Sequence, residues 1–355
     1  MGSSANGKGK ENKASRQIQT IADLAVLAGV SPSTVSRALN DSPLINVETR
    51  ARIQALAQEH NFQLHLGAQS LRRQRTKTLG VVVNSERPPG RTMSDPFLLE
   101  FLGEIASAAM QRGHDILLAD AQTAPHDWCA HFLRGGRADG IIAIARFSER
   151  ERQAARLAAA GAPFVAWGPA LPSQPYCSVG SDDLQGGRQA VEHLICLGRE
   201  RIAFLGAGSD CLEIQQRYEG YSAALAAAGR TVEPRYVAYA QSTGQAGYEA
   251  MRRLLVQAPD LDAIFVSSDV MAIGAIEALR GTGRTVPGDV AVVGYDDIAL
   301  AAYVSPPLTT VRQRLGEAAR LLVERLLAIV EGQPAPSVML PTELIVRQSC
   351  GALSR

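Results

Sequence analysis

Short apolar segments recur along the chain between residues 79 and 294, and they constrain the fold more than any other feature. Ala-rich stretches of helical composition separate them. Apolar strands joined by crossover helices are typical of parallel sheets that are covered on both faces. Because a single core stops growing at roughly 250–300 residues, so many strands predict two α/β lobes with a cleft between them. The segments are LGVVV (79–83), DILLA (115–119), GIIAI (140–144), PFVAW (163–167), RIAFL (201–205), DAIFV (262–266) and VAVVG (290–294).

The charge is divided unevenly along the chain, although the formal net charge of all 355 residues is only +1. Residues 1–77 hold 11 Lys and Arg against 5 Asp and Glu, which leaves 25 against 30 for the remainder. This asymmetry favours a polyanionic partner for the first part, and a solvated basic arm without a partner is the alternative. Residues 1–17, rich in Gly, Ser, Asn and Lys, are predicted to form a disordered tail.

The segment that follows this tail has the pattern of three short helices. Thr20 is placed to cap a first helix, and Gly29 permits a tight turn after it. Ser31 is placed to cap a second helix with Pro32 at its first position, where a missing N–H is tolerated. A third helix is predicted over residues 47–60.

Two short helices joined by a tight turn are the pattern of a helix-turn-helix, whose second helix enters the major groove of DNA. A helical hairpin with a purely structural role is the alternative. Arg37 is the one side chain of the expected exposed face that is able to donate two hydrogen bonds to O6 and N7 of a guanine. The residues expected to be exposed are Pro32, Ser33, Thr34, Ser36, Arg37 and Asn40.

The stretch TIADLAVLAGVSPSTVSRALN (20–40) resembles, almost position for position, the DNA-reading segment of the LacI family of bacterial transcription regulators. The resemblance continues to about Gly351. It implies that Pro32, Ser33 and Arg37 read base edges. It also implies phosphate contacts by Thr20, Thr34, Ser36 and Asn40.

The stretch GAQSLRRQRTKTLGVVV (67–83) resembles the family's hinge helix and the entry into its effector body. There Leu71 is similar to the leucine that wedges into the minor groove and bends the duplex. The resemblance implies a small all-α DNA-binding domain and an α/β two-lobed, periplasmic-binding-protein-like domain. The expected divisions are a disordered tail (1–17), a helix-turn-helix domain (18–66), a hinge helix and linker (67–78), and an effector-binding and dimerisation domain (79–355) with an N-lobe (about 79–177 and 307–337) and a C-lobe (about 178–306 and 338–355).

Several stretches between residues 179 and 313 resemble the family's ligand-binding body, which is similar to periplasmic sugar-binding proteins. The resemblance implies that Arg217 binds a sugar and that Asp296 accepts hydrogen bonds from its hydroxyls, which suits a guanidinium and a carboxylate. The residue types alone leave open a surface salt bridge for Arg217 and a helix cap for Asp296. The other implied pocket positions are Phe97, Ser242 and Ser268.

The resemblance also implies partners. They are a pseudo-palindromic double-stranded operator, a small effector that is a sugar or sugar derivative, and a second copy of the chain. The helix expected over residues 96–110 would lie in the dimer contact. The implied function is a sequence-specific transcription regulator that represses carbohydrate-utilisation genes.

No motif in the sequence supports catalysis or a bound cofactor. GAGSDC (206–211) begins like a dinucleotide-binding fingerprint, but Cys211 stands where a third glycine is needed, which argues against the alternative of an NAD-dependent sugar dehydrogenase. No Ser, His and Asp set stands out, and the five cysteines are scattered without zinc spacing. We therefore expect no enzyme, no cofactor and no metal site.

The sequence also bears on location. It has no apolar run of membrane-spanning length and no signal-peptide core, and its scattered cysteines suit a reducing compartment. We expect a cytoplasmic protein without a membrane partner. A sugar-binding protein that serves transport is the alternative, but it would need a signal peptide and no helix-turn-helix.

Overall fold

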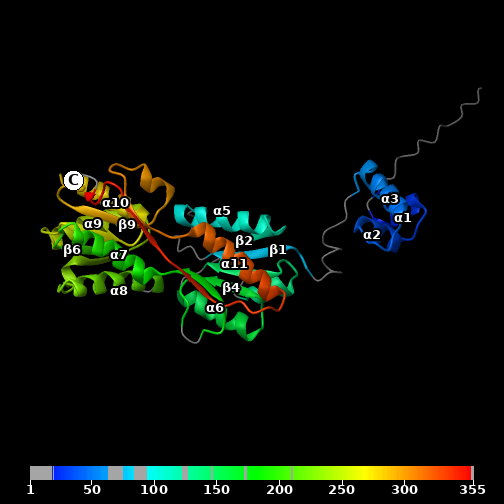
Figure 1. Cartoon of the computed structure of the whole chain (residues 1–355), viewed down its shortest axis with the longest axis horizontal. Helices are drawn as coiled ribbons and strands as arrows, with labels where there is room; N and C mark the ends of the chain where they lie inside the picture. Colours follow the sequence, from blue (N-terminus) through cyan, green and yellow to red (C-terminus); the bar gives the residue numbers. More distant parts are fainter. Residues whose placement is uncertain are drawn as a thin grey trace, which may run out of the picture. The chain divides into compact units, whose positions relative to one another are not determined.

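The computed structural model of the chain describes residues 18, 20–62, 75–83, 94–121, 127–144, 147–171, 174–208 and 211–352 (Figure 1). The chain divides into two units, Met1–Gln74 and Arg75–Arg355, which we call the N-terminal unit and the body. The expected tail over residues 1–17, the first part of the expected hinge segment and Leu71 lie outside the described residues.

The N-terminal unit contains three helices that follow the sequence prediction: α1 (Ile21–Ala28), α2 (Pro32–Leu39) and α3 (Val47–Glu59). Each begins after a residue whose side chain accepts a hydrogen bond from a backbone N–H of the first turn. Their apolar faces meet in a small core, in which Leu24, Val35 and Ile53 are fully buried. This core fixes which face of α2 is left outside.

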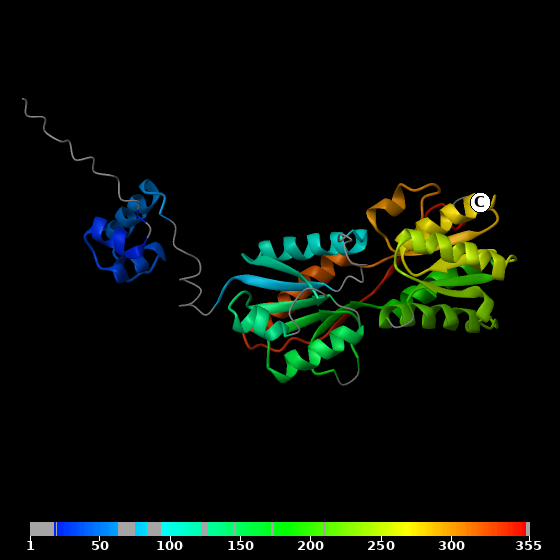
Figure 2. The same ribbon diagram turned by 180° about the vertical axis from the view of Figure 1, so that it is seen from behind.

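The first lobe of the body, called the N-lobe, is a six-stranded sheet with helices on both faces. Its elements are β1 (Thr78–Val83), β2 (Asp115–Asp120), β3 (Gly140–Ile144), β4 (Phe164–Trp167), β5 (Ser178–Ser181), β11 (Val338–Leu340), α5 (Pro96–Met110), α6 (Phe147–Ala159), α11 (Leu315–Val330) and a π-helical turn η1 (Cys129–Arg134). The strand order is β11-β5-β4-β3-β1-β2, and every neighbouring pair is parallel. Helices α5 and α11 cover one face, and α6 with η1 covers the other (Figure 2).

The second lobe, called the C-lobe, repeats this three-layer arrangement. Its elements are β6 (Ile202–Ala207), β7 (Val237–Ala240), β8 (Ala263–Val266), β9 (Ala291–Asp296), β10 (Thr309–Arg312), β12 (Glu343–Ile345), α7 (Asp183–Cys196), α8 (Leu212–Ala227), α9 (Gly244–Gln257), α10 (Asp269–Gly281) and the short helices η2 (Pro234–Tyr236) and η3 (Ala299–Ala302). The strand order is β12-β10-β9-β8-β6-β7, with β12 antiparallel to β10 and all other pairs parallel. Helices α7 and α8 lie together on one face, and α9 and α10 lie on the other (Figure 1).

All seven apolar segments of the sequence are strands, so the two-lobed α/β prediction is confirmed. The expected lobe boundaries were each placed a few residues too early. Strands β5 and β11 pair within the N-lobe sheet, whereas β10 pairs within the C-lobe sheet. The reason is that the chain crosses between the lobes after a strand has ended, and the crossovers follow residues 181, 312 and 340.

No helix in the described part of the chain is both long and apolar enough to cross a membrane.

Candidate functional site

The turn between α1 and α2 determines how the second helix is presented. Thr20 forms a capping box with Asp23: its hydroxyl accepts from the Asp23 backbone N at 3.1 Å, and the Asp23 carboxylate accepts from the Thr20 backbone N at 3.0 Å. Gly29 ends α1 with φ 64°, a left-handed conformation that suits glycine. The Ser31 hydroxyl then accepts from the Thr34 backbone N at 3.2 Å and starts α2. These local bonds make the turn rigid.

The structure separates the six residues expected on the outer face of α2 into two groups. Pro32, Ser33 and Arg37 are exposed, and the Arg37 guanidinium makes no hydrogen bond or ion pair with any described residue. The others are half-buried and already bonded within the unit: Thr34 to the Ser31 hydroxyl at 2.9 Å, and Asn40 to the Ser36 carbonyl at 2.6 Å. Arg37 is therefore the donor that is ready for an external acceptor.

In the C-lobe, close packing of α7 on α8 brings Arg217 to its partners. A Cβ atom at Gly187 would lie 2.3 Å from the Arg217 carbonyl oxygen, and one at Gly220 would lie 2.2 Å from the Leu184 carbonyl oxygen. Both positions therefore need glycine, because the two helix backbones touch there. This approach places Arg217 of α8 beside Asp183, the first residue of α7.

Arg217 is buried, with 6% of its surface exposed, and its guanidinium is held on several sides. Its Nε donates to Asp183 Oδ1 at 2.8 Å, and one terminal nitrogen donates to the Ser267 carbonyl at 2.6 Å. The same terminal nitrogen lies 3.7 Å from Asp296 Oδ1, and the guanidinium carbon lies 3.6 Å from the centre of the Tyr295 ring. The open alternative of a surface salt bridge is wrong, since the ion pair is buried.

Asp296 ends β9 and is 9% exposed. Its Oδ1 accepts from Gln313 Nε2 at 2.8 Å, and its backbone φ of 110° is one that L-residues rarely adopt. Burial raises the pKa of Asp296 well above its usual range, and the charge of Arg217 opposes this only in part. Burial raises the pKa of Asp183 as well, because the charge of Arg217 and its hydrogen bond offset the loss of hydration only in part. Asp296 does not cap a helix, so that alternative is also wrong.

The carboxyl edge of the C-lobe sheet faces the amino end of α5 from the N-lobe. Asp95 caps α5 and is close enough for its charge to raise the pKa of Asp296. Phe97 packs against the apolar cores of both lobes, and its ring lies 6.0 Å from the ring of Phe101. Since ligands of open parallel sheets bind beyond the carboxyl ends of the strands, this region is the candidate ligand site.

The two expected serine positions differ in what their side chains do. Ser268 follows β8 and is 6% exposed, and its hydroxyl caps α10 by accepting from the Met271 backbone N at 3.4 Å. Ser242 follows β7 and is exposed. Both therefore lie beyond carboxyl ends of C-lobe strands, but only Ser242 presents its side chain to solvent.

Three residues around Arg217 were missed by the sequence reasoning: Asp183, Tyr295 and Gln313. Asp182 and Asp183 follow β5, and Asp296 and Asp297 stand at the end of β9. These two pairs of adjacent acidic residues were the sequence signal that could have indicated Asp183. Asp296 and Asp297 have different partners: Asp296 accepts from Gln313, whereas Asp297 is bonded at 2.7 Å to both Arg312 and Arg347.

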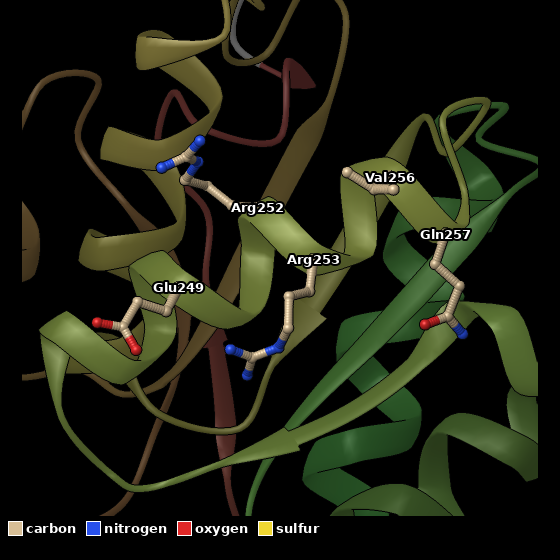
Figure 3. A pocket seen from close by; sticks show the side chains of 5 residues that line it. All are labelled: Glu249, Arg252, Arg253, Val256 and Gln257. Atoms are coloured by element: carbon tan, nitrogen blue, oxygen red, sulfur yellow. The ribbon is translucent and has the colours of Figure 1, made fainter.

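Three hollows lined by described residues contain none of the predicted site residues. One lies on the outward face of α9, where Glu249, Arg252, Arg253, Val256 and Gln257 all come from a single helix (Figure 3). Across the described ranges, no group of three or more His, Cys, Asp or Glu side chains is arranged to hold a metal ion.

Comparison with known families gives two matches. Residues 20–63 match the bacterial regulatory proteins of the lacI family, and residues 191–350 match a periplasmic binding protein-like domain. The HTH-type transcriptional regulator CelR of Thermobifida fusca is 35% identical over 341 residues, which is 94% of this chain and 99% of CelR. The HTH-type transcriptional repressor PurR of Haemophilus influenzae is 31% identical over 339 residues, or 93% of this chain and 98% of PurR.

Solved structures agree with these matches. A complex of the transcriptional regulator CelR with cellobiose has a TM-score of 0.71 and 33% identity, covering 93% of this chain and 99% of that one. The lac repressor dimer bound to operator and the anti-inducer ONPF has a TM-score of 0.82 and 26% identity, covering 93% and 98%. The chain therefore belongs to the LacI family of bacterial regulatory proteins, and it is a DNA-binding transcription regulator.

Proposed function

We propose that the chain binds a pseudo-palindromic operator as a homodimer and represses the genes beside it, with α2 of each copy in the major groove. Pro32, Ser33 and Arg37 read base edges in this proposal. The observation that carries it is the exposed guanidinium of Arg37, which has no partner among the described residues, on a helix whose amino end is capped by Ser31. The phosphate contacts are Thr20, Thr34, Ser36 and Asn40, and Leu71 is the minor-groove wedge.

The experiment for DNA binding is a gel-shift series with a duplex selected from a random pool by the full chain. Affinity should fall steeply as salt rises, because phosphate contacts release condensed counterions. A chain without residues 1–78 should lose the affinity. Operator affinity that survives this deletion would refute the proposal.

The candidate ligand site is proposed to bind a small neutral sugar or sugar derivative, and cellobiose is the first to test because a CelR structure holds it. Asp296 would accept hydrogen bonds from ligand hydroxyls, and Arg217 would donate to them. Phe97 would supply an apolar face from the N-lobe, with Ser242 and Ser268 at the rim. The genes controlled would serve carbohydrate use, and the chain would act in the cytoplasm by binding, without a catalytic step.

Thermal unfolding with and without cellobiose tests the candidate ligand site. A ligand at 100 times its Kd adds about 2.7 kcal/mol to the free energy of unfolding. Asp296→Asn should abolish this shift while keeping the fold, because Arg217 keeps its pair with Asp183. Glu249→Gln, on the outward face of α9, is the matched control and should keep the shift. An Asp296→Asn protein with a full shift would exclude Asp296 from the ligand site.

A further inference from the structure

The body begins with a strained connection between the linker and the first strand. Arg75 is the first described residue of the body, and β1 starts at Thr78, so Thr76 and Lys77 form the entry. Lys77 has φ 53°, a left-handed conformation that is strained for a residue with a Cβ. Such a conformation persists only where surrounding contacts hold it.

The Asp139 carboxylate makes those contacts. Its Oδ1 accepts from the Thr76 backbone N at 2.6 Å and from the Thr76 hydroxyl at 2.9 Å. Its Oδ2 accepts from the Lys77 backbone N at 2.8 Å. Two successive backbone N–H groups aimed at one anion form a nest, and hydrogen bonds to an ionised acceptor are stronger than neutral ones. We call this set the Asp139 anchor.

The backbone around the anchor ties the same residues to both neighbouring strands. The Asp139 N donates to the Thr78 carbonyl at 2.8 Å, and the Asp115 N donates to the Lys77 carbonyl at 2.8 Å. Asp139 lies directly before β3 and Asp115 begins β2, so the entry is held between the two neighbours of β1. The ion pair of Arg75 with Glu331, at 3.9 Å between half-exposed side chains, adds little.

We propose that Asp139 is a positioning residue for DNA binding: it fixes the place and direction in which the linker leaves the N-lobe. Without the anchor, the entry residues would join the linker and lengthen it. In the proposed homodimer, one N-terminal unit binds its half-site while the other is still free. A longer connection lowers the effective concentration of the free unit at the second half-site. The inference rests on the DNA-binding function, and it requires no contact of Asp139 with DNA or ligand.

The experiment measures the affinity of the full chain for a duplex selected by the wild type, together with amide hydrogen exchange at Thr76 and Lys77. Asp139→Ala should weaken operator binding at least about fivefold, the lower end of typical couplings. Exchange at both amides should become fast, while amides of the C-lobe core stay protected. Asp139→Asn keeps one acceptor oxygen, so both of its effects should be intermediate, and it serves as the test should Asp139→Ala not fold.

Asp115→Ala is the matched control. It removes the same charge at the entry of a neighbouring strand, but the Asp115 side chain is exposed and makes no bond within the described ranges. It should bind as the wild type does. An Asp139→Ala chain that binds the duplex with wild-type affinity would overturn the anchor, as would an equal loss in Asp115→Ala. If the wild type selects no duplex at all, the DNA-binding proposal fails and this one fails with it.

Discussion

Two arginines, one in each unit, are prepared for recognition in opposite ways. Arg37 on α2 is exposed, and within the described residues its guanidinium is unengaged. Arg217 on α8 is 6% exposed, bonded to Asp183 and to the Ser267 carbonyl, and stacked on Tyr295. The N-terminal unit thus keeps its donor in water, whereas the C-lobe keeps its donor inside the fold.

The difference follows from what each residue is proposed to meet. A base edge in the open major groove is in contact with water. An exposed side chain that binds it exchanges water for the base and breaks no bond within the protein. A small ligand enclosed in a cleft gains from donors that are already oriented, because less side-chain freedom is lost on binding. Removal of Arg37 should therefore change only DNA affinity, and removal of Arg217 should change stability first.

The largest effect is expected for Arg217→Met. Removing one partner of a buried ion pair leaves uncompensated charge, here the carboxylates of Asp183 and Asp296, and should lower the free energy of unfolding of the body by about 3–5 kcal/mol. Urea unfolding followed by circular dichroism measures it. Arg188→Met is the control, because Arg188 pairs with Glu192 on the exposed side of α7 and should contribute under about 1 kcal/mol. Equal losses in the two variants would remove the distinction between buried and exposed arginines.

A second effect concerns the buried carboxylates of the C-lobe. Burial raises the pKa of Asp269 from 3.8 to about 7, although the carboxylate accepts from Thr310 and the Ile298 backbone N. Between these values the folded body binds a proton that the unfolded chain has released. Stability should therefore fall as pH rises from about 4 to about 7, by at most about 4 kcal/mol.

Unfolding of the body at several pH values checks this expectation. Asp269→Asn does not titrate, so the difference in pH slope between it and the wild type isolates Asp269. Identical slopes would mean that Asp269 is ionised in the fold, held by its two hydrogen bonds.

A third effect concerns Arg37→Ala, which should cost about 1–3 kcal/mol in discrimination at one base pair of each half-site. Ser36→Ala, a lost phosphate contact, should weaken all sequences alike. Competition between the selected duplex and its single-base variants measures both. Equal losses of affinity for selected and random DNA in Arg37→Ala would refute base reading. A change in the thermal stability of this variant would contradict the finding that the Arg37 guanidinium has no partner among the described residues.

The same contrast explains how much of the molecule the sequence predicts. The caps and turn of the N-terminal unit depend on residues at most a few positions apart, so Thr20, Gly29 and Ser31 are recognised from local pattern. The buried apolar strands are recognised from composition. Strands β11 and β12, of three residues each, are too short for such a signal, and β7 is only partly buried.

The partners of Arg217 could not be predicted from local pattern, because they are distant from it in sequence. Asp183 lies 34 positions away and Ser267 lies 50 positions away. The resemblance indicated Arg217 and Asp296, but it gave no sign that a second carboxylate holds the arginine. Only packing of α7 on α8 brings that carboxylate to it, and the backbone contact at Gly187 is a tertiary feature.

The smallest expected effect concerns Thr20. This residue is exposed, as Arg37 is, but its hydroxyl is already bonded within the fold, as the guanidinium of Arg217 is: it bonds to Asp23. A phosphate contact by this hydroxyl has to replace its 2.7 Å bond to the Asp23 carboxylate. Thr20→Val removes the cap at nearly constant shape and should lower the stability of the N-terminal unit by about 1 kcal/mol, whereas Thr20→Ser keeps the cap and should change it little.

Hydrogen exchange of the α1 amides in the full chain measures the cap, and affinity for the selected duplex measures the phosphate contact. Suppose that the α1 amides of Thr20→Val lose protection and that its affinity for the selected duplex falls only as much as the lower stability of the N-terminal unit explains. Thr20 then acts as a cap alone. If affinity falls while α1 keeps its protection, the hydroxyl contacts DNA, and the cap is the weaker of its two roles.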